Sequence, residues 1–532
     1  MEICKPYYHY CQGLTIICNI AYKGALTHLG LASKGRGLAM LISGAEKLKR
    51  MRDGRVVFIG SQRVDDVTVH PAFARGAKAV ADFYDQKASA EYATDLTYEE
   101  NGATHSIWWK RPTTREDLSR RMRGSKALAD MTFGFFGRSP DHIGSLVTGL
   151  AMNPMVLDRL QEGRGENLMH YYEHARDEDI YLTYAVTPPS GLRSSEATPG
   201  SKLSHPSLRV VREEDDGVVV SGMKMLATAA VYADDMWIGN LQPLDESRLA
   251  ESITCAIPIA TKGLSLWARQ PYALNVRDPL DYPVSYRFDE SDCVLVCEEV
   301  KVPADRIFLH NNAAKSRAIY LETPANCLAN HQSNCRFWAK MSLIVGLASR
   351  TCMVNGVDKI PAVREQLGRL AALEATIGGL VRGQIDAFES WPDGYAIPNR
   401  RIMYAALNWC QEHHTDIIDT LRTLMGGVPL QMPADSTILD DPVLKEVFDR
   451  WWGTPAIEAA DRMKLYKLGW DITGSEFAGR HQLYEKFYAG HSALVRASCD
   501  REAPWEEFHA TVDRALAEAS SESLLGKTPG RH

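Results

Sequence analysis

An arginine and a histidine stand four residues apart at the predicted start of a helix, in the stretch GRSPDH at 137–142. Ser139 suits the N-cap and Pro140 the first helical position, so we expect a helix to begin here. Arg138 and His142 would then lie close together, beside the unpaired backbone N–H groups of a helix N-terminus. A cation, an imidazole and free N–H groups in one place favour an anion or a phenolate. A capped surface helix with both side chains in solvent would fit the same residues.

The composition is that of an ordinary globular protein with two or three domains. Of the 532 residues, 45% are hydrophobic and 24% charged, and the net charge is -7. A chain of this length buries a large core, and its charge gives no reason to expect nucleic acid or a membrane as a partner. The 11 cysteines form no CxxC pair. We predict no metal site, and we expect reduced thiols in a cytoplasmic protein.

Hydrophobic periodicity divides the chain into helical and β-rich parts. Helical spacing dominates residues 40–185 and 311–518, whereas short β-rich runs between Gly, Asp and Pro turns fill residues 186–310. This pattern predicts an N-terminal helical domain, a small central β domain and a C-terminal helical bundle. Residues 519–532 are predicted to be a frayed tail. The longer helices are expected at Ala45–Arg52, Pro71–Gln86, Thr114–Ala129, Pro140–Ala151, Arg336–Val354, Ala362–Ser390, Arg400–Met425 and Ala456–Ile472. Arg55–Ile59 and Gln62–Val67 are expected to form a hairpin.

Residues 1–39 do not match the pattern of the rest of the chain. They contain an apolar run, Gly13–Tyr22, that is too short to span a bilayer and is followed by no convincing cleavage site for a signal peptide. We therefore expect residues 1–39 to be a leader that is disordered or not native, with the natural start at Met40.

Six short motifs lie in order along the chain. They are Arg52–Arg55, Val67–Phe73, Gly137–Asp141, Lys224–Thr228, Tyr282-Pro283 with Arg287–Glu290, and Gly474–His481. Together they closely resemble the oxygenase (large) component of the 4-hydroxyphenylacetate 3-hydroxylase family, from about residue 43 to about residue 515. The resemblance implies an α+β, mainly α, acyl-CoA-dehydrogenase-like fold whose central domain is a small β-barrel. It also implies a homotetramer or homodimer.

The resemblance implies a two-component, FAD-dependent aromatic monooxygenase. Reduced FAD (FADH2) would come from a separate flavin reductase, and the sequence accordingly contains neither a GxGxxG after a strand nor a P-loop. In the family's reaction, reduced flavin captures O2 as a C4a-hydroperoxide, and a phenol attacks it through the ring carbon ortho to the hydroxyl. Such a site must deprotonate or polarise the phenol and must keep water from the peroxide.

The resemblance also assigns roles to individual residues. Catalytic and substrate-binding roles fall on Arg138, His142 and Tyr184, with further substrate contacts at Gly239 and Asn240. Thr228 would bond the flavin near N5, and Arg480 could meet a phosphate. The flavin-binding residues implied are Thr228, Ser190, Gly191, Leu192, Arg193, Ser475, Glu476, Phe477, Ala478, Gly479 and Arg480.

The chain departs from the family at two positions around the phenol oxygen. The family carries Tyr where this chain has His142, and His where this chain has Tyr184, so the pair is exchanged. Both types of side chain remain, but the exchange puts the identity of the substrate in doubt. We expect neutral His142, kept so by Arg138, to act as the base, and Tyr184 to act as a donor that orients the oxygen.

Three alternatives remain open. A hydroxyacyl-CoA dehydratase-type lyase on a similar fold would need an iron–sulfur cluster, but Arg138 and His142 occupy the region where its cysteines are expected. A catalytically silent scaffold is the second alternative. The third is an aromatic hydroxylase whose substrate is tethered to a carrier protein.

Overall fold

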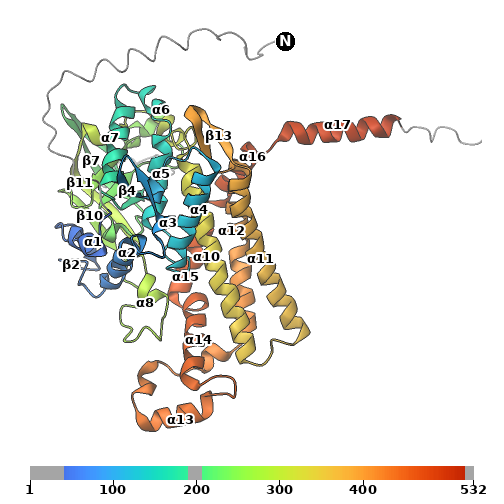
Figure 1. Cartoon of the computed structure of the whole chain (residues 1–532). Helices are drawn as coiled ribbons and strands as arrows, with labels where there is room; N and C mark the ends of the chain where they lie inside the picture. The colour runs from blue at the N-terminus through green and yellow to red at the C-terminus, as the bar shows by residue number, and fades with distance from the viewer. Residues whose placement is uncertain (1–40, 190–205, 522–532) are drawn as a thin grey trace, which may run out of the picture. The chain divides into compact units, whose positions relative to one another are not determined.

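Helices predominate in the computed structural model, which describes residues 41–189 and 206–521 (Figure 1). The helices are α1 Gly44–Arg50, α2 Ala74–Lys87, α3 Ala93–Leu96, α4 Arg115–Asp130, α5 Pro140–Ala151, α6 Met155–Asp158, α7 Arg164–Asp177, α8 Ser285–Phe288, α9 Lys315–Ala318, α10 Ala325–Val354, α11 Pro361–Asp386, α12 Arg400–Met425, α13 Pro442–Trp452, α14 Ala459–Thr473, α15 Glu476–Phe487, α16 Ser492–Arg501 and α17 Trp505–Ser521. No helix in the described ranges is both long and apolar enough to cross a lipid bilayer.

Two larger sheets and two hairpins complete the fold. The strands are β1 Val56–Ile59, β2 Gln62–Val64, β3 Thr97–Glu100, β4 Ala103–Ser106, β5 Leu182–Ala185, β6 Arg209–Glu214, β7 Gly217–Lys224, β8 Asp235–Ile238, β9 Thr254–Pro258, β10 Leu264–Ala268, β11 Cys293–Pro303, β12 Ile307–Leu309, β13 Glu389–Trp391 and β14 Tyr395–Ile397. The order is β2-β1-β10-β11-β7-β6 in one sheet and β12-β9-β8-β5 in the other. The remaining strands pair as β3-β4 and β13-β14.

Both larger sheets include strands from residues 40–185, the segment predicted to be mainly helical. The hairpin β1-β2 forms as predicted and joins the larger sheet through a parallel pairing of β1 with β10. Strand β5 joins the smaller sheet by pairing in parallel with β8. Both sheets therefore combine strands from residues 40–185 with strands from residues 186–310, and the predicted central domain is built on both segments. This finding matters for the site, because Tyr184 lies on β5.

Several helix boundaries agree with the periodicity, and two differ for physical reasons. Helix α12 spans the predicted residues, and α5 begins after its predicted N-cap. Helix α10 begins at Ala325 rather than at Arg336, because its first turns bury polar side chains such as His331 and Gln332, which form no apolar stripe. Helix α11 ends at Asp386 because the next residues pair as strand β13.

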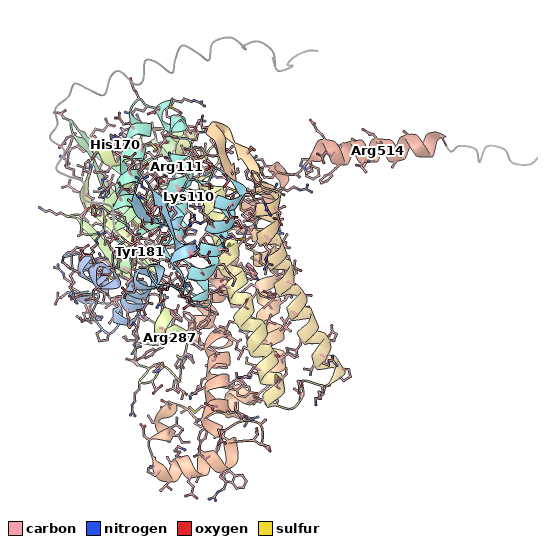
Figure 2. All side chains as sticks on the ribbon, viewed as in Figure 1. Lys110, Arg111, His170, Tyr181, Arg287 and Arg514 are labelled. Atoms are coloured by element: carbon pink, nitrogen blue, oxygen red, sulfur yellow. The ribbon has the colours of Figure 1, made fainter. Side chains whose placement is uncertain are left out.

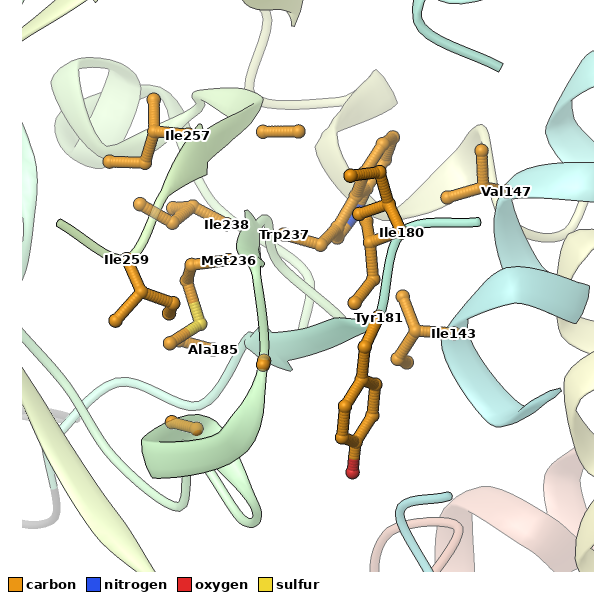
Figure 3. Packing of buried hydrophobic residues seen from close by; sticks show 14 of the residues in the cluster. Ile143, Val147, Ile180, Tyr181, Ala185, Met236, Trp237, Ile238, Ile257 and Ile259 are labelled. Atoms are coloured by element: carbon orange, nitrogen blue, oxygen red, sulfur yellow. The ribbon is translucent and has the colours of Figure 1, made fainter. Parts of the chain in front are cut away.

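Helix α5 lies at the centre of the fold, and each of its residues is buried. Its Ile143 and Val147 belong to the same apolar cluster as Ile180, Tyr181 and Trp237 (Figure 3). Its other neighbours include α10, which also packs against α4, α11 and α12. Burying a large aliphatic or aromatic side chain contributes about 1.5–3 kcal/mol. This packing therefore fixes the position of the α5 N-terminus, where Arg138 and His142 lie.

Helix α17 presents an apolar stripe to solvent at the end of the described chain. Trp505, Phe508, Val512 and Leu516 recur at helical spacing and are 42–64% exposed. Figure 2 shows the side chains along this helix, with Arg514 labelled. Isolated exposed apolar residues are ordinary, whereas these four side chains form one continuous stripe.

Candidate active site

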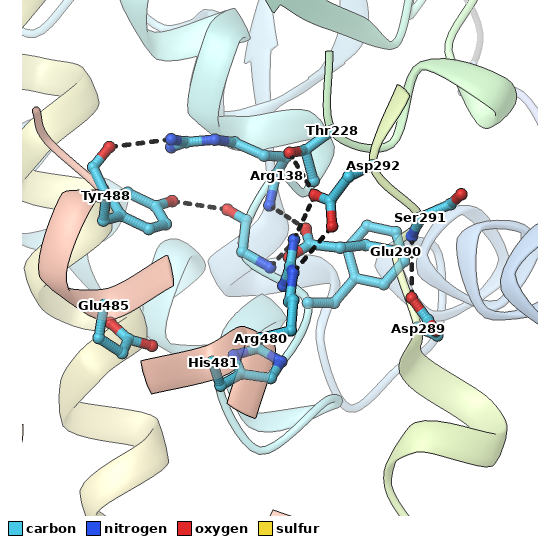
Figure 4. Close-up of polar contacts among 12 residues, drawn as sticks. Arg138, Thr228, Asp289, Glu290, Ser291, Asp292, Arg480, His481, Glu485 and Tyr488 are labelled. Atoms are coloured by element: carbon cyan, nitrogen blue, oxygen red, sulfur yellow. Dashed lines mark hydrogen bonds and ion pairs between the residues drawn. The ribbon is translucent and has the colours of Figure 1, made fainter. Parts of the chain in front are cut away.

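The backbone before α5 is held by a buried carboxylate. The N–H groups of Gly137 and Arg138 both donate to Glu290 Oε2, at 2.9 and 2.8 Å (Figure 4). The hydroxyl of Tyr181 donates to the carbonyl of Arg138. Glu290 is fully buried, so it satisfies two N–H groups that would otherwise lack partners. These bonds fix the direction in which the Arg138 side chain leaves the backbone.

The guanidinium of Arg138 lies among aromatic rings and has no carboxylate partner. Its Nη1 lies 2.8 Å from His142 Nε2, and its Nη2 donates to the carbonyl of Tyr488 at 2.9 Å. The rings of Tyr488 and Tyr184 have centroids 3.9 and 5.0 Å from the guanidinium carbon. Within the described chain no Asp or Glu oxygen lies within 4.0 Å of this guanidinium, although Arg138 is only 7% exposed. An unpaired buried cation is costly in a low dielectric.

His142 is neutral and one of its nitrogens has no partner. Burial first, and then the charges of Arg138 and Arg336, hold the pKa of its imidazole well below the ordinary value. Its Nε2 faces Arg138, whereas its buried Nδ1 makes no hydrogen bond to any described residue. The rings of Tyr184 and Tyr488 both lie 5.6 Å from the imidazole. The structure thus brings Arg138, His142 and Tyr184 together, as the sequence predicts.

Ser139 is the N-cap residue of α5, as predicted, but its side chain does not cap the helix. Ser139 has the extended backbone of an N-cap, yet its hydroxyl donates to Asp141 Oδ1 at 2.6 Å instead of accepting from a backbone N–H. Gln332 of α10 donates to the same carboxylate oxygen at 3.1 Å. Burial raises the pKa of Asp141 to about 6. Asp141 Oδ1 therefore joins Ser139 to α10, whereas its buried Oδ2 has no hydrogen-bond partner among the described residues.

Four of the sequence motifs meet in one polar network. Arg480 of α15 contacts Glu290 at 2.8 Å and Asp292 at 2.7 and 3.0 Å. Thr228 donates from its hydroxyl to Asp292 at 2.8 Å. Because Glu290 also holds the backbone of Arg138, the acidic segment 289–292 connects the α5 N-terminus, the turn after β7 and helix α15 (Figure 4).

A second buried group of charges lies beside the first. Glu485 of α15 pairs with Arg336 and Lys340 of α10, and all three side chains are at most 1% exposed. The two cations hold the pKa of Glu485 well below its usual range against the effect of burial. Tyr488 lies between the two groups, since its ring centroid is 4.4 Å from the guanidinium carbon of Arg336 and 3.9 Å from that of Arg138.

Two family models cover nearly all of the described chain. The model for the 4-hydroxyphenylacetate 3-hydroxylase N terminal matches residues 43–309, and the model for its C terminal matches residues 316–517. The chain belongs to the 4-hydroxyphenylacetate 3-hydroxylase family. Membership confirms the resemblance that the six motifs indicated.

Curated and solved relatives align over most of their length. The chain is 28% identical to pyoverdin chromophore biosynthetic protein PvcC of Pseudomonas aeruginosa, over 92% of this chain and 98% of that protein. It is 30% identical to the 4-hydroxyphenylacetate 3-monooxygenase oxygenase component of Thermus thermophilus, over 81% of this chain and 87% of that one. A crystal structure of such a component with FAD and 4-hydroxyphenylacetate matches with a TM-score of 0.84 and 26% identity, covering 90% and 99% of the two chains.

The flavin-binding residues predicted from the family have varied surroundings. Ser190, Gly191, Leu192 and Arg193 lie outside the described residues. Ser475 caps α15 by accepting from the N–H of Ala478 at 3.1 Å, and Glu476 follows in the first turn. Phe477 and Ala478 are buried. A Cβ on Gly479 would meet no atom within 4 Å, so packing does not require glycine there.

The contacts of Arg480 differ from the phosphate contact expected from the sequence. Its Nε and Nη2 bond Asp292, and its Nη1 bonds Glu290. The carboxylates of Asp292 and Glu290 accept hydrogen bonds from the Arg480 guanidinium, and their negative charge disfavours a phosphate beside it. Sequence reasoning could not foresee these partners, because they lie about 190 positions away in the chain, and the role of Arg480 toward a flavin stays a prediction.

Gly239 and Asn240 belong to a different buried network. Lys224 donates to the carbonyl of Gly239 at 3.1 Å and to the side chain of Asn240. Asn240 in turn donates to the carbonyl of Glu251 and to the hydroxyl of Ser316. None of these described contacts reaches Arg138. The contacts explain both residues structurally, and their role toward a substrate stays a prediction.

Sequence reasoning missed Tyr488, which touches Arg138 from the other side. Its hydroxyl donates to the carbonyl of Gly137 at 2.7 Å. The signal was available, because Arg480, Tyr484 and Tyr488 recur at a spacing of four residues and so share one helical face.

No group of three or more His, Cys, Asp or Glu side chains that could hold a metal ion occurs in the part of the chain that the structure describes.

Proposed function

We propose that this chain is the oxygenase component of a two-component monooxygenase that hydroxylates a phenol ortho to its hydroxyl group. The proposal rests on one observation above all. Three side chains meet at the N-terminus of a buried helix: a guanidinium and a neutral imidazole nitrogen that have no carboxylate or hydrogen-bond partner, respectively, among residues 41–189 and 206–521, and a tyrosine. Family membership supports the same chemistry. We propose reduced FAD and O2 as its co-substrates, as a relative has been crystallised with FAD and 4-hydroxyphenylacetate.

The chain offers one polar group whose chemistry suits a reduced flavin. Thr228 is 4% exposed, and its hydroxyl proton is committed to Asp292. Its oxygen therefore presents only lone pairs, which match an N–H donor such as those on a reduced flavin ring. Thr228 would hold the ring there, together with residues of the segments 190–193 and 475–479. When bound, reduced FAD together with O2 would supply the oxygen atom that is transferred and the two electrons required.

The protein's own residues would bind the phenol and polarise it. Arg138 stabilises negative charge on the phenol oxygen, and this charge makes the ortho carbon a better nucleophile. Tyr184 and Tyr488 line the space with rings and limit the access of water. One oxygen atom replaces a ring hydrogen, and the other leaves as water.

Product analysis tests the proposal. The chain is mixed with chemically reduced FAD, air and a panel of phenols, and mass spectrometry is used to find a gain of one oxygen. We expect product from at least one phenol, and no oxidation of NADH by the chain alone. Arg138→Met is the control, since it should fold and form far less product. Absence of any oxygenated product from free or carrier-tethered phenols would overturn the proposal, and the tethered arm tests the version in which a carrier protein presents the substrate.

We further propose a separate flavin reductase as a transient partner and association into a dimer or tetramer in the cytoplasm. The exposed apolar stripe of α17 supports self-association. The eight described cysteines are free thiols, which suits a reducing compartment. Light scattering of the full chain, and of a chain that ends before Trp505, would measure the assembly. Equal masses per particle would exclude α17 from it.

A further inference from the structure

Helix α15 ends against the guanidinium of Arg138. The helix spans Glu476–Phe487, and Tyr488 is its C-cap residue, with helical backbone angles. Carbonyl groups in the last turn of a helix have no partner within the helix, and they carry the negative end of its dipole. The carbonyl of Tyr488 accepts a hydrogen bond from Arg138 Nη2 at 2.9 Å. The C-terminal end of α15 therefore stabilises this buried cation.

This end of α15 compensates for the unfavourable place of Arg138 beside α5. Arg138 directly precedes Ser139, the N-cap of α5, so its charge lies near the positive end of that helix dipole. A cation is disfavoured at a helix N-terminus and favoured at a helix C-terminus. The carbonyl end of α15 offsets part of the cost, and a neutral carbonyl does not cancel the positive charge as a carboxylate at hydrogen-bond distance would. The charge of Arg138 is thus stabilised in a form that can still act on a substrate.

Tyr488 contacts Gly137 and Arg138 through three different groups. Its carbonyl accepts from the guanidinium, its ring centroid lies 3.9 Å from the guanidinium carbon, and its hydroxyl donates to the carbonyl of Gly137 at 2.7 Å. Tyr488 is buried, and a guanidinium stacked on a buried ring gains more than one stacked at an exposed site. One residue therefore contacts both the backbone before α5 and the side chain that leaves it.

The contact with Tyr488 is the one that ties this guanidinium to another element of the fold. Two hydrogen bonds between described residues hold it, one to His142 and one to the Tyr488 carbonyl. His142 belongs to α5 itself, one turn after Arg138, and Glu290 binds the backbone N–H of Arg138 rather than its side chain. The direction of the guanidinium relative to α15 and the rest of the bundle therefore depends on Tyr488.

We propose that Tyr488 is a positioning residue of the reaction site, which sets the direction of the Arg138 guanidinium and influences the reaction through it. This inference rests on the proposed function. In that reaction the guanidinium must lie beside the oxygen on which negative charge develops, because a donor stabilises that charge only from the correct position. Without the Tyr488 ring, Arg138 keeps its charge but no longer presents its planar fork in one direction. Loss of Tyr488 should therefore reduce catalysis only while Arg138 is present.

A double-mutant cycle on the full chain separates this role from a merely structural one. Tyr488→Leu removes the ring and the hydroxyl, and we expect product formation with excess reduced FAD to fall about tenfold in kcat with little change in KM. In the Arg138→Met background, Tyr488→Leu should cause no further loss, because the group through which Tyr488 acts is absent. Mass spectrometry measures the product, including the small amount expected from Arg138→Met.

Two further variants provide a rescue and a matched control. Tyr488→Phe keeps the ring beside the guanidinium and should retain most of the activity that Tyr488→Leu loses. Arg75 of α2 is held in the same manner outside the site, since the ring centroid of Tyr286 lies 3.7 Å from its guanidinium carbon and the carbonyl of Ala273 accepts from it. Tyr286→Leu therefore removes a ring from a similar pair, and it should leave product formation unchanged.

Urea unfolding shows whether each variant is folded, and two substitutions keep the cycle complete. If Tyr488→Leu does not fold, Tyr488→Phe replaces it in the cycle, with a smaller expected loss. If Arg138→Met yields no measurable product, Arg138→Lys is the second background. Lysine keeps a charge without the planar fork, so the further loss from Tyr488→Leu should be smaller there than in the wild type.

The outcomes distinguish the inference from the proposed function. An equal loss from the Tyr488 substitution in both backgrounds would show that the residue supports the fold alone, and it would overturn the inference while the proposed function stands. No loss in the wild-type background would overturn the inference in the same way. Absence of product from the wild type would overturn the proposed function, and the inference with it.

Discussion

Arg138 and Arg336 both lie beside the ring of Tyr488, and they differ in their partners. Arg336 pairs with Glu485 through both terminal nitrogens, and Lys340 joins the same carboxylate. Arg138, with its guanidinium carbon 3.9 Å from the same ring, pairs with no carboxylate of the described residues and touches a neutral imidazole. Both arginines are at least nine-tenths buried. Within the described chain, each cation of the first group is paired with a carboxylate, whereas the guanidinium of the second is not.

This difference in partners predicts that one group of charges mainly affects stability and the other mainly affects catalysis. A satisfied buried ion pair is expensive to break, because removal of one partner leaves the other charge uncompensated. An unpaired cation contributes little to folding and is available to stabilise charge that develops on a substrate. Substitutions in the Glu485 group should therefore change stability, and those around Arg138 should change activity.

Glu485→Gln should have the largest effect on stability. The variant leaves Arg336 and Lys340 buried without a counter-charge, and breaking such a pair costs about 3–5 kcal/mol. Urea unfolding at neutral pH measures the loss. Glu446→Gln is the matched control, because its partner Arg450 is 60% exposed on α13, and the change should stay within about 0.5 kcal/mol. A loss below about 1 kcal/mol in Glu485→Gln would contradict the comparison.

The stability advantage of Glu485 should disappear in acid. The pKa of Glu485 is lowered in the folded chain, so the unfolded state binds the proton more readily. The contribution is therefore complete above the unfolded pKa of about 4.3 and decreases as pH falls below it, through the folded pKa. Unfolding free energies of the wild type and of Glu485→Gln, measured between neutral pH and acid, should converge. A constant difference would show that another property of the substitution causes the loss.

Arg138→Met should abolish most hydroxylation and leave folding intact. Loss of one positioned donor to a developing oxyanion typically costs about 100- to 1000-fold in rate, or about 2.7–4 kcal/mol. Stability should stay the same or rise, since Met fills similar space without a buried charge. Product formation with excess reduced FAD and urea unfolding are measured on one preparation. A variant that hydroxylates normally, or that unfolds as readily as Glu485→Gln, would remove the contrast between the two arginines.

Tyr184→Phe should have the smallest effect of the four. One neutral hydrogen bond to the phenol oxygen is worth about 1 kcal/mol, which corresponds to roughly a fivefold change. The ring stays beside Arg138, so the exclusion of water should largely persist. The ratio of hydroxylated product to H2O2 measures the coupling, and it should fall only slightly. A large fall in this ratio would show that Tyr184 does more than donate one hydrogen bond.

Local sequence patterns predicted those parts of the fold that depend on neighbouring residues. The N-cap before α5, the limits of α12 and the hairpin β1-β2 each follow from residues close in the chain. The motifs also contain Arg138, His142 and Thr228, which the structure places around one buried network, and the roles predicted for them stay predictions. The pairing of Arg480 with Glu290 joins positions 190 residues apart, and no periodicity reports such a contact. The contact between Tyr488 and Arg138 joins positions 350 residues apart and likewise appears only in the three-dimensional structure.

The carboxylate of Glu290 also affects how the site opens. It holds the amide protons of Gly137 and Arg138 and, through its other oxygen, the Arg480 side chain of α15. These amide protons can exchange with solvent only when the carboxylate releases them. The exchange rates of two backbone amides would therefore report how often the contact between Glu290 and the N-terminus of α5 opens.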